Sequence, residues 1–263
     1  MAKKKKITAR VLSQKVLAEG VMDLCIETNL AEDAKPGQFV GIFPKNAATL
    51  LPRPISICGY DKEKGTLRIV YRIAGTGTAE FSLYKPDDSV QVLGVLGNGF
   101  PLDKADGKRV LIIGGGIGVP PLLGLAKELK AEGKAAEVTM VMGYRDSETF
   151  LSEEFKDQGK LYIATEDGSV GTKGNVIDAC KENGITADVI YACGPMPMLK
   201  GIKSFATEIG AKAYLSLEER MACGVGACLG CICKTKNVDE HSHVNNARIC
   251  TDGPVFDADD LEL

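Results

Sequence analysis

Four cysteines near the end of the chain have the spacing of a metal site. Cys223, Cys228 and Cys231 follow the pattern Cys-x4-Cys-x2-Cys, and Cys250 comes after a further eighteen residues. This spacing is typical of plant-type 2Fe-2S proteins, in which one tight loop and one distant cysteine supply four thiolates. Glycines between the first three cysteines would let the loop curl so that its amides point at the sulfur atoms. We therefore predict a 2Fe-2S cluster.

Zinc is the structural alternative, because four thiolates also suit tetrahedral zinc. Zinc sites usually combine two short Cys-x2-Cys hairpins, whereas here one long loop is joined by a single cysteine, which favours the cluster. Cys233 is left over, and we interpret it as a packed residue. His241 and His243 are interpreted as solvated loop residues, because the Cys-x-His pairs of a Rieske centre are missing from the sequence.

A glycine-rich turn follows a predicted buried strand at 108–116 and precedes a predicted helix at 120–133. Its glycines could let backbone amides approach the pyrophosphate of a dinucleotide at the start of the helix. The turn could equally be only a tight strand–helix junction, since Val119 stands where a strict Gly-x-Gly-x-x-Gly pattern has its third glycine. The four glycines are Gly114, Gly115, Gly116 and Gly118.

Two further segments could contact a nucleotide. Cys193, Gly194 and Pro195 lie at the end of a later predicted strand, where ligands of open α/β sheets collect, so Cys193 either lines a nicotinamide pocket or is a buried small side chain. Arg53 is followed by a Gly/Thr turn at 75–78 that opens a helix. An arginine fork and such a turn could clamp a second pyrophosphate, but Arg53 could also be an ordinary surface cation.

Three regions must position these residues. Residues 7–100 are short β-rich runs with one predicted helix at 77–85, which indicates a small antiparallel barrel. From residue 108 strands and helices alternate, which predicts a parallel sheet with crossover helices. We predict an α+β multidomain protein: an antiparallel β-barrel flavin domain at 1–101, an α/β parallel-sheet nicotinamide domain at 102–215 and a small 2Fe-2S cysteine module at 216–263.

Composition narrows the function classes. The 263 residues are 44% apolar and 25% charged with a formal net charge of −3, which disfavours nucleic acid as a partner. We expect no signal peptide and no membrane span, and hence a cytoplasmic protein in which nine cysteines serve metal binding or catalysis. With two histidines, both in the cysteine module, no general-base set is evident and we predict no catalytic side chain, as in an electron carrier.

Five segments, in order, resemble one protein family. "RPISI", "YRIAGTGT", "GGGIGVPPLLGLAK", "YACGPMPML" and "ERMACGVGACLGC" look like the electron-transfer subunits of NAD-linked, two-component dihydroorotate dehydrogenases, within the ferredoxin–NADP reductase superfamily. The resemblance implies FAD, a 2Fe-2S cluster and NAD as cofactors. It also implies an FMN-containing dihydroorotate dehydrogenase catalytic subunit as partner, in a heterotetramer of two plus two chains. The alternative is a flavin and iron–sulfur NAD(P)H-reductase subunit of a hydrogenase or a ferredoxin-linked transhydrogenase.

The resemblance assigns roles to individual residues. The cluster would be held by the four cysteines named above, and the dinucleotide would lie against the glycine turn and Cys193 to Pro195. Ile55 replaces the aromatic residue of the superfamily's commoner Arg-x-Tyr-Ser motif. The choice of NAD over NADP follows the resemblance, because Arg145 would favour a 2′-phosphate and Asp146 or Glu148 would repel it. Residues implied to contact FAD are Arg53, Pro54, Ile55, Ser56, Val70, Tyr71, Arg72, Gly77 and Thr78.

Overall fold

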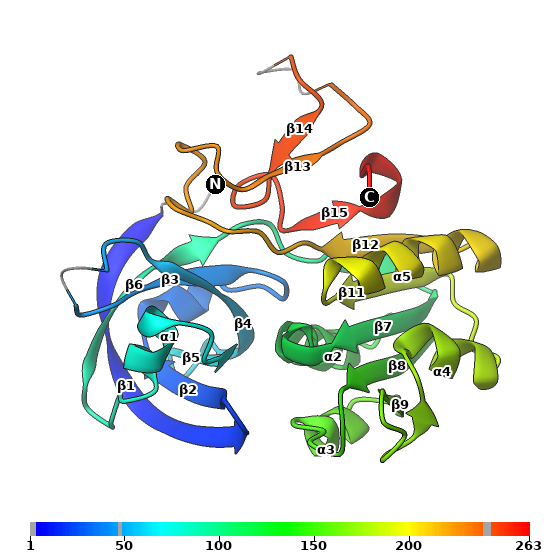
Figure 1. Ribbon diagram of the computed structural model, residues 1–263, viewed down its shortest axis with the longest axis horizontal. Coiled ribbons are helices and arrows are strands. Elements are labelled where there is room, and N and C mark those ends of the chain that lie inside the picture. The colour runs from blue at the N-terminus through cyan, green and yellow to red at the C-terminus, as the bar shows by residue number, and fades with distance from the viewer. Residues whose placement is uncertain (1–3, 47–48, 239–242) are drawn as a thin grey trace.

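The computed structural model describes residues 4–46, 49–238 and 243–263. Its N-terminal part is a closed antiparallel barrel in the strand order β1-β2-β5-β4-β3-β6, seen at the left of Figure 1. This confirms the predicted barrel. The strands are β1 (Lys5–Ala18), β2 (Val21–Glu27), β3 (Phe39–Phe43), β4 (Arg53–Asp61), β5 (Thr66–Arg72) and β6 (Ser89–Leu96).

The barrel closes because its strands alternate apolar and polar side chains. In β5, Leu67, Ile69 and Tyr71 are buried and share one core with Val90 and Val92 of β6. The helix expected at 77–85 is present as α1 (Thr76–Phe81) and is shorter than predicted. Residues 82 and 83 form a turn, and residue 85 precedes a proline, whose ring disfavours helical conformation in the residue before it.

The second part is a sheet in the order β10-β9-β8-β7-β11-β12-β15, in which the neighbours from β10 to β12 are parallel. The order reverses between β7 and β11, so the topological switch point lies there. The strands are β7 (Arg109–Gly115), β8 (Glu137–Tyr144), β9 (Lys160–Thr165), β10 (Thr172–Lys173), β11 (Val189–Cys193), β12 (Lys212–Ser216) and β15 (Val255–Asp257). The helices are α2 (Pro120–Glu132), α3 (Ser152–Lys156), α4 (Val176–Glu182) and α5 (Met196–Ile209).

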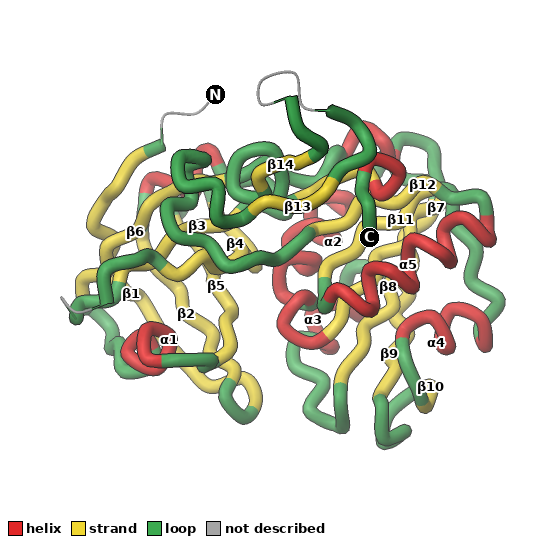
Figure 2. Tube along the Cα trace, turned by 45° about the horizontal axis from the view of Figure 1, so that its top comes forward, coloured by secondary structure: helices red, strands yellow, loops and turns green. Residues whose placement is uncertain are grey.

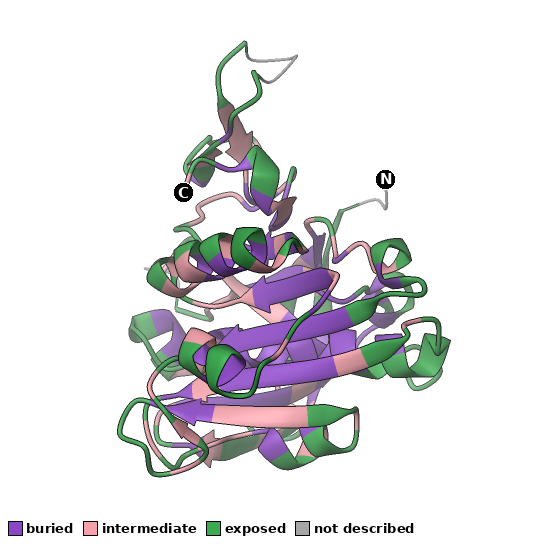
Figure 3. Cartoon of the chain, turned by 90° about the vertical axis from the view of Figure 1, so that its right-hand side faces the viewer, coloured by how far each residue is buried: buried purple, intermediate pink, exposed green. Residues whose placement is uncertain are grey.

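Helices cover both faces of this sheet. Val110 and Ile112 of β7 pack with residues of α2 and α3, whereas Leu111 and Ile113 pack with residues of α4 and α5. Burial on both faces makes β7 a continuous apolar run, which is why the sequence predicts it well. Figure 3 shows the strands of the sheet largely buried between exposed helix surfaces.

Two strands of this sheet were not predicted. β10 has two residues, and β15 pairs antiparallel with β12 at the far edge of the sheet. The charged stretch at 145–158 contains the five-residue helix α3 rather than a full crossover helix. Since β15 comes from the C-terminal 48 residues, that segment completes the sheet of the second part, which we name the nucleotide domain (102–215) after its predicted ligand. The domain boundaries themselves stay a prediction.

The cysteine module lies above the other two parts in Figure 1, and its hairpin projects away from them. The hairpin consists of β13 (Ile232–Lys234) and β14 (Asn246–Arg248), and Figure 2 shows it crossing over the space between barrel and sheet. Asn98, just after β6, ties the module to the barrel: its Nδ2 donates to the carbonyls of Thr251 and Asp252 at 3.1 and 3.0 Å. The module is thus anchored to both larger parts.

The barrel and the nucleotide domain share an apolar seam. Cys58 of β4 and Val70 of β5 belong to one buried cluster with Leu122 and Leu123 of α2. A Cβ atom at Gly124 would lie 3.0 Å from the carbonyl oxygen of Cys58, so the glycine allows the helix to rest directly on the strand. Among the described residues, no helix has the length and apolarity needed to cross a membrane.

The C-terminal anchor gives a first prediction. Leu261 is fully buried in the core that also contains Leu215 of β12, so Leu261→Ala should lower the free energy of unfolding by about 2–5 kcal/mol. Urea denaturation followed by circular dichroism measures this. Leu83→Ala is the matched control, because Leu83 is 73% exposed and its truncation should change stability by at most about 0.5 kcal/mol. Equal losses in the two variants would contradict the anchoring role.

Candidate functional site

The glycine turn and the Cys-Gly-Pro segment meet at the switch point of the sheet. Gly114 pairs with Cys193 in the parallel register of β7 and β11, so both strands end at the same edge. A Cβ atom at Gly118 would lie 2.4 Å from the carbonyl oxygen of Cys193, so only glycine permits this approach. Met198 of α5 fills the space behind, with its Sδ 2.5 Å from a Cβ position at Gly115. The structure therefore brings the two predicted dinucleotide segments into direct contact.

The thiol of Cys193 is neutral in this setting. Burial raises the pKa of Cys193 to about 12, although a hydrogen bond with Ser216 acts in the opposite direction. The side chain therefore contributes no negative charge at the mouth of the switch point, where a nicotinamide ring would lie. A neutral thiol suits a packing and positioning role rather than nucleophilic chemistry.

The structure also brings Arg53 to the predicted Gly/Thr turn. A Cβ atom at Gly77 would lie 2.7 Å from Nε of Arg53, and Nη1 of Arg53 donates to the carbonyl of Leu51 at 2.7 Å. Thr78 shapes the turn, because its Oγ1 accepts from the amides of Ala74 and Gly75 at 2.8 and 3.2 Å. No ion pair is found for Arg53 within the described residues, so its guanidinium is available to an anion such as a pyrophosphate.

The remaining residues predicted to contact FAD lie on β4 and β5 of the barrel, and their side chains point in different directions. Pro54, Ile55 and Ser56 are half-buried and pair with β3. Val70 packs in the seam, whereas Tyr71 points into the barrel, where its hydroxyl bonds Gln14 at 3.1 Å. Burial raises the pKa of Tyr71, and any contact with a flavin would come from its backbone.

Arg72, at the end of β5, is exposed and reaches across the seam. Its Nη2 lies 3.8 Å from a Cβ position at Gly116 of the glycine turn. The last residue of this barrel strand therefore adjoins the predicted dinucleotide loop.

The four predicted cluster cysteines form two close pairs. Cys223 interacts with Cys228, and Cys250 interacts with Cys231 and also with Cys223. In the parts of the chain that the structure describes, no three His, Cys, Asp or Glu side chains come close enough to bind one metal ion together. A zinc ion needs four thiolates around one point, whereas a 2Fe-2S cluster takes two on each iron. Cys223 with Cys228 and Cys231 with Cys250 would supply two thiolates to each iron of a binuclear cluster.

Backbone amides point at the sulfur atoms of Cys223 and Cys228, which form the outer pair. The Cys223 sulfur accepts from the amides of Val225 and Ala227 at 3.4 and 3.3 Å, and the Cys228 sulfur accepts from Gly230 at 3.4 Å. Burial alone would raise the pKa of Cys223, but the hydrogen bonds outweigh it and lower the pKa to about 6. The loop thus favours a thiolate at this position. Gly224 and Gly226 have φ of 66° and 85°, which allows the predicted curl.

The inner pair is buried. Cys231 and Cys250 are 2% and 1% exposed and belong to the core that contains Leu96 of the barrel and Leu217. Burial raises the pKa of Cys250 to about 12, and contact with Cys231 adds to this rise. One pair therefore faces the body of the protein and the other faces its surface.

Comparisons with known proteins identify the family. A family model described as the iron–sulfur cluster binding domain of dihydroorotate dehydrogenase B matches residues 218–262, and one described as an oxidoreductase NAD-binding domain matches residues 112–204. The dihydroorotate dehydrogenase B (NAD(+)) electron transfer subunit of Listeria welshimeri is 44% identical over 97% of this chain and 98% of its own. That of a Geobacillus species is 44% identical over the full length of both chains. The chain belongs to the family of dihydroorotate dehydrogenase B electron transfer subunits.

Solved structures agree on the fold. A structure of NADH-dependent reduced ferredoxin-NADP oxidoreductase, described in relation to flavin-based electron bifurcation, superposes with a TM-score of 0.84 and 28% identity over 97% of this chain and 89% of its own. A ferredoxin NADP+ reductase from Neisseria gonorrhoeae, 16% identical with a TM-score of 0.65 over 83% of this chain and 95% of its own, shares the barrel and sheet. The electron transfer subunit family thus has the ferredoxin–NADP reductase architecture, as predicted.

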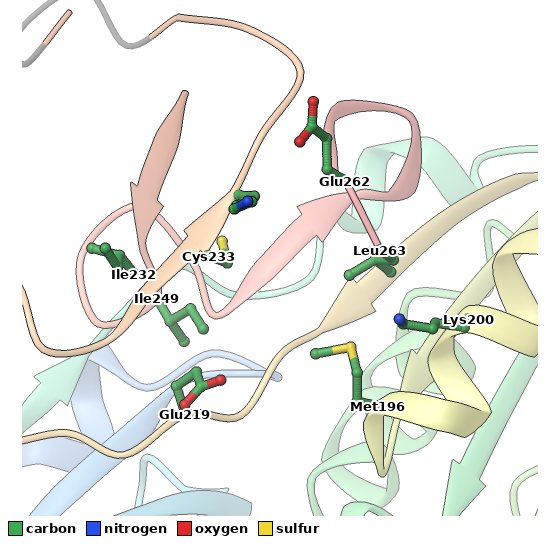
Figure 4. A pocket seen from close by; sticks show the side chains of 9 residues that line it. Met196, Lys200, Glu219, Ile232, Cys233, Ile249, Glu262 and Leu263 are labelled. Atoms are coloured by element: carbon green, nitrogen blue, oxygen red, sulfur yellow. The ribbon is translucent and has the colours of Figure 1, made fainter. Parts of the chain in front are cut away.

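Cys233 packs beside the cluster module, as interpreted from the sequence. It pairs with Ala247 in the β13–β14 hairpin and lies against the buried core, and burial raises its pKa to about 11. It lines a pocket of about 270 Å³ in which Met196 and Lys200 of α5 face it from the other side (Figure 4). This pocket is lined by none of the residues predicted to bind FAD or NAD.

Histidine ligation gains no support in this electron transfer subunit. His243 is exposed, and His241 lies outside the described residues.

Sequence reasoning missed two supporting residues. Asp252 accepts from the Arg248 amide at 2.7 Å and from its Nε at 3.0 Å, which shapes the turn that presents Cys250. Asn98 fixes that turn to the barrel. Each is a polar residue next to a glycine. This combination is too common in loops to identify a functional residue from the sequence.

The cysteine pairs give a second prediction. Cys223→Ser should lower the iron content from about two atoms per chain to near zero, because one iron would lose a ligand. Iron analysis and visible absorption of anaerobically purified protein measure the change. Cys233→Ser is the matched control and should retain the iron, since Cys233 only packs. Loss of iron in both variants, or in neither, would show that the ligand set is wrong.

The contact at Gly118 gives a third prediction. Gly118→Ala would push the glycine turn away from Cys193, so the Kd for NADH should rise about tenfold or more, which corresponds to about 1.4 kcal/mol or more. The dependence of the anaerobic flavin-reduction rate on NADH concentration, measured by rapid mixing with the flavin-loaded chain, gives this Kd. Gly201→Ala in α5 is the control, because its Cβ would meet only Ile177 at 3.7 Å. Unchanged NADH binding in Gly118→Ala would rule out this turn as the dinucleotide site.

Proposed function

We propose that this chain passes electrons from the FMN of a dihydroorotate dehydrogenase catalytic subunit, through its own 2Fe-2S cluster and FAD, to NAD+ in pyrimidine biosynthesis. The partner is the FMN-containing catalytic subunit, in a cytoplasmic heterotetramer of two plus two chains. Full-length relatives at 44% identity with the name of electron transfer subunit support this role. The observation that carries the proposal is the grouping of four cysteines, Cys223 with Cys228 and Cys231 with Cys250. They lie in a module that contacts both the barrel and the nucleotide domain.

The three cofactors complement one another chemically. Nicotinamide exchanges electrons as hydride pairs, an iron–sulfur cluster exchanges them singly, and a flavin can do both when bound between them. In this proposal each cofactor has a separate site on the chain. Arg53 and the turn at Gly77 and Thr78 would hold the FAD pyrophosphate, and the amides of the glycine turn would hold that of NAD.

Nothing in the described sites suggests proton abstraction by this chain. Cys193 is held neutral by burial, and the described histidine, His243, is exposed in the cysteine module far from the switch-point residues in sequence. Removal of a proton from dihydroorotate therefore falls to the catalytic subunit in this proposal. The side chains of this chain bind and orient cofactors.

Exposed apolar residues around the cysteines support a protein partner there. Large exposed apolar patches mark interaction sites, and the cysteine module exposes several large apolar side chains. They are Val225, Leu229, Ile232, Val238 and Val244. A partner that covers them would also bring its own cofactor close to Cys223 and Cys228.

A second candidate is the reductase subunit of a ferredoxin-linked transhydrogenase. The TM-score of 0.84 to NADH-dependent reduced ferredoxin-NADP oxidoreductase favours it. Its sequence identity of 28% is well below the 44% shared with dihydroorotate dehydrogenase B electron transfer subunits over the full length. The dihydroorotate system is therefore preferred.

The proposal gives a fourth prediction. The purified chain alone should bind one FAD, reduce an artificial acceptor with NADH and fail to oxidise dihydroorotate, because the base and FMN are on the partner. Adding the catalytic subunit encoded in the same genome should restore NAD+ reduction by dihydroorotate, measured at 340 nm as NADH formation. Dihydroorotate oxidation by the lone chain, or no coupling with the partner, would refute the proposal.

A pair of variants locates the partner in the same assay. Leu229→Asp, at a residue 61% exposed beside the cysteines, should abolish coupled activity and leave the NADH–acceptor reaction intact. Leu83→Asp, 73% exposed on the barrel, is the matched control and should keep both reactions. Coupled activity that survives Leu229→Asp would place the partner elsewhere.

A further inference from the structure

One arginine joins the barrel to the nucleotide domain. Nε and Nη2 of Arg68 donate to Oδ1 and Oδ2 of Asp23 at 3.0 and 2.9 Å, and its Nη1 donates to Oε2 of Glu154 at 2.8 Å. Asp23 belongs to β2 of the barrel, whereas Glu154 belongs to α3 of the nucleotide domain. The two carboxylates use three nitrogens of one guanidinium. The planar guanidinium can bind two carboxylates in fixed directions, whereas a lysine ammonium is a point charge without such directions.

This ion cluster is partly buried and well satisfied. The Asp23 side chain is 5% exposed and that of Arg68 is 22% exposed, so their interaction is screened less than a surface pair. Lys15 lies 3.4 Å from Asp23, and Lys127 of α2 lies 3.1 Å from Glu154. Burial would raise the pKa of Glu154, but hydrogen bonds from Arg68 and Lys127 outweigh it and lower the pKa. Glu154 is therefore ionised and paired at neutral pH.

The rest of the seam combines a non-directional apolar contact with further directional ties, since the amide of Glu19 also donates to the carboxylate of Glu148 at 3.3 Å. The apolar cluster of Cys58, Val70 and the α2 leucines is non-directional, so it favours closeness rather than one alignment. The hydroxyl of Tyr60 donates to Glu128 of α2 at 2.9 Å, a further directional tie between strand β4 and the helix. In Figure 1, β4 lies on the side of the barrel that faces α2.

The Arg68 tie lies on the strand that leads to the predicted cofactor sites. Two residues beyond Arg68, the same strand reaches Val70, then Tyr71 and Arg72, which are predicted to contact FAD. Nη2 of Arg72 is 3.8 Å from a Cβ position at Gly116 of the dinucleotide turn. β5 is thus fixed to the nucleotide domain at Arg68 and meets the dinucleotide loop at Arg72.

We infer that Arg68 and Glu154 are positioning residues that set the alignment of the flavin-binding barrel against the nicotinamide domain, and thereby the hydride-transfer distance. This inference rests on the proposed function. The hydride moves with its electron pair between the nicotinamide and the flavin, which are held by different domains. A displacement of about 1 Å between reacting groups can cost up to about 100-fold in rate. The alignment of the seam therefore acts directly on that step.

Two variants, each of which removes one carboxylate partner of Arg68, test the inference. Glu154→Gln removes the tie between domains, and Asp23→Asn removes the tie within the barrel. Rapid-mixing measurements under anaerobic conditions give the rate of flavin reduction by NADH, and NADH deuterated at C4 shows whether hydride transfer limits it. Amide hydrogen exchange at β4 and α2, in the chain without nicotinamide, reports the seam independently of activity.

Glu154→Gln should slow flavin reduction about tenfold, with FAD content and the Kd for NADH unchanged and faster exchange at β4 and α2. Asp23→Asn should lower the denaturation midpoint and leave the reduction rate within about twofold of the unmodified chain. Wild-type reduction rates and exchange in Glu154→Gln, or equal slowing in both variants, would overturn the inference. Failure of NADH to reduce flavin in the unmodified chain would instead refute the proposed function, and the exchange comparison would still decide whether Glu154 holds the seam.

Discussion

The direct packing of α2 on strand β4 is the constraint on which the rest of the structure depends. Gly124 removes the side chain that would keep the helix away from the Cys58 carbonyl, and apolar residues from both domains then share one core. That contact brings two otherwise independent folds together at their ligand-binding edges. Without it, the barrel and the sheet would each bind a nucleotide, but hydride could not pass between them, because transfer needs the reacting atoms about 3–3.5 Å apart.

Much of this arrangement was predictable because the signals are local. The run at β7 is continuously apolar since helices cover both faces, and the barrel strands alternate since only one face is buried. The cysteine spacing predicted the cluster because a loop of that length has few ways to present three sulfurs. In each case neighbouring residues alone determine the pattern.

What could not be predicted depends on contacts between segments distant in sequence. β15 has three residues and becomes a strand only because β12 offers an edge, so no local pattern identifies it. Arg68 looks like any exposed strand arginine until Asp23 and Glu154 are placed beside it, 45 and 86 residues away. The inward orientation of Tyr71 follows from barrel closure, which is likewise a property of the whole domain.

The same long-range contacts explain why a small module can serve as an electron carrier. Single-electron transfer needs a constant separation between carriers, and a module on a flexible linker would not provide one. Here the chain leaves β12 at Ser216 and reaches Cys223 within seven residues, so the tether is short. The chain then returns through the turn that Asn98 fixes to the barrel and joins the sheet as β15. The inner cysteines are buried in the core shared with Leu96, which is the last residue of a barrel strand. The predicted cluster site is thus built on the barrel and the parallel sheet at once, and its distance from each is set by packed side chains rather than by the length of a linker.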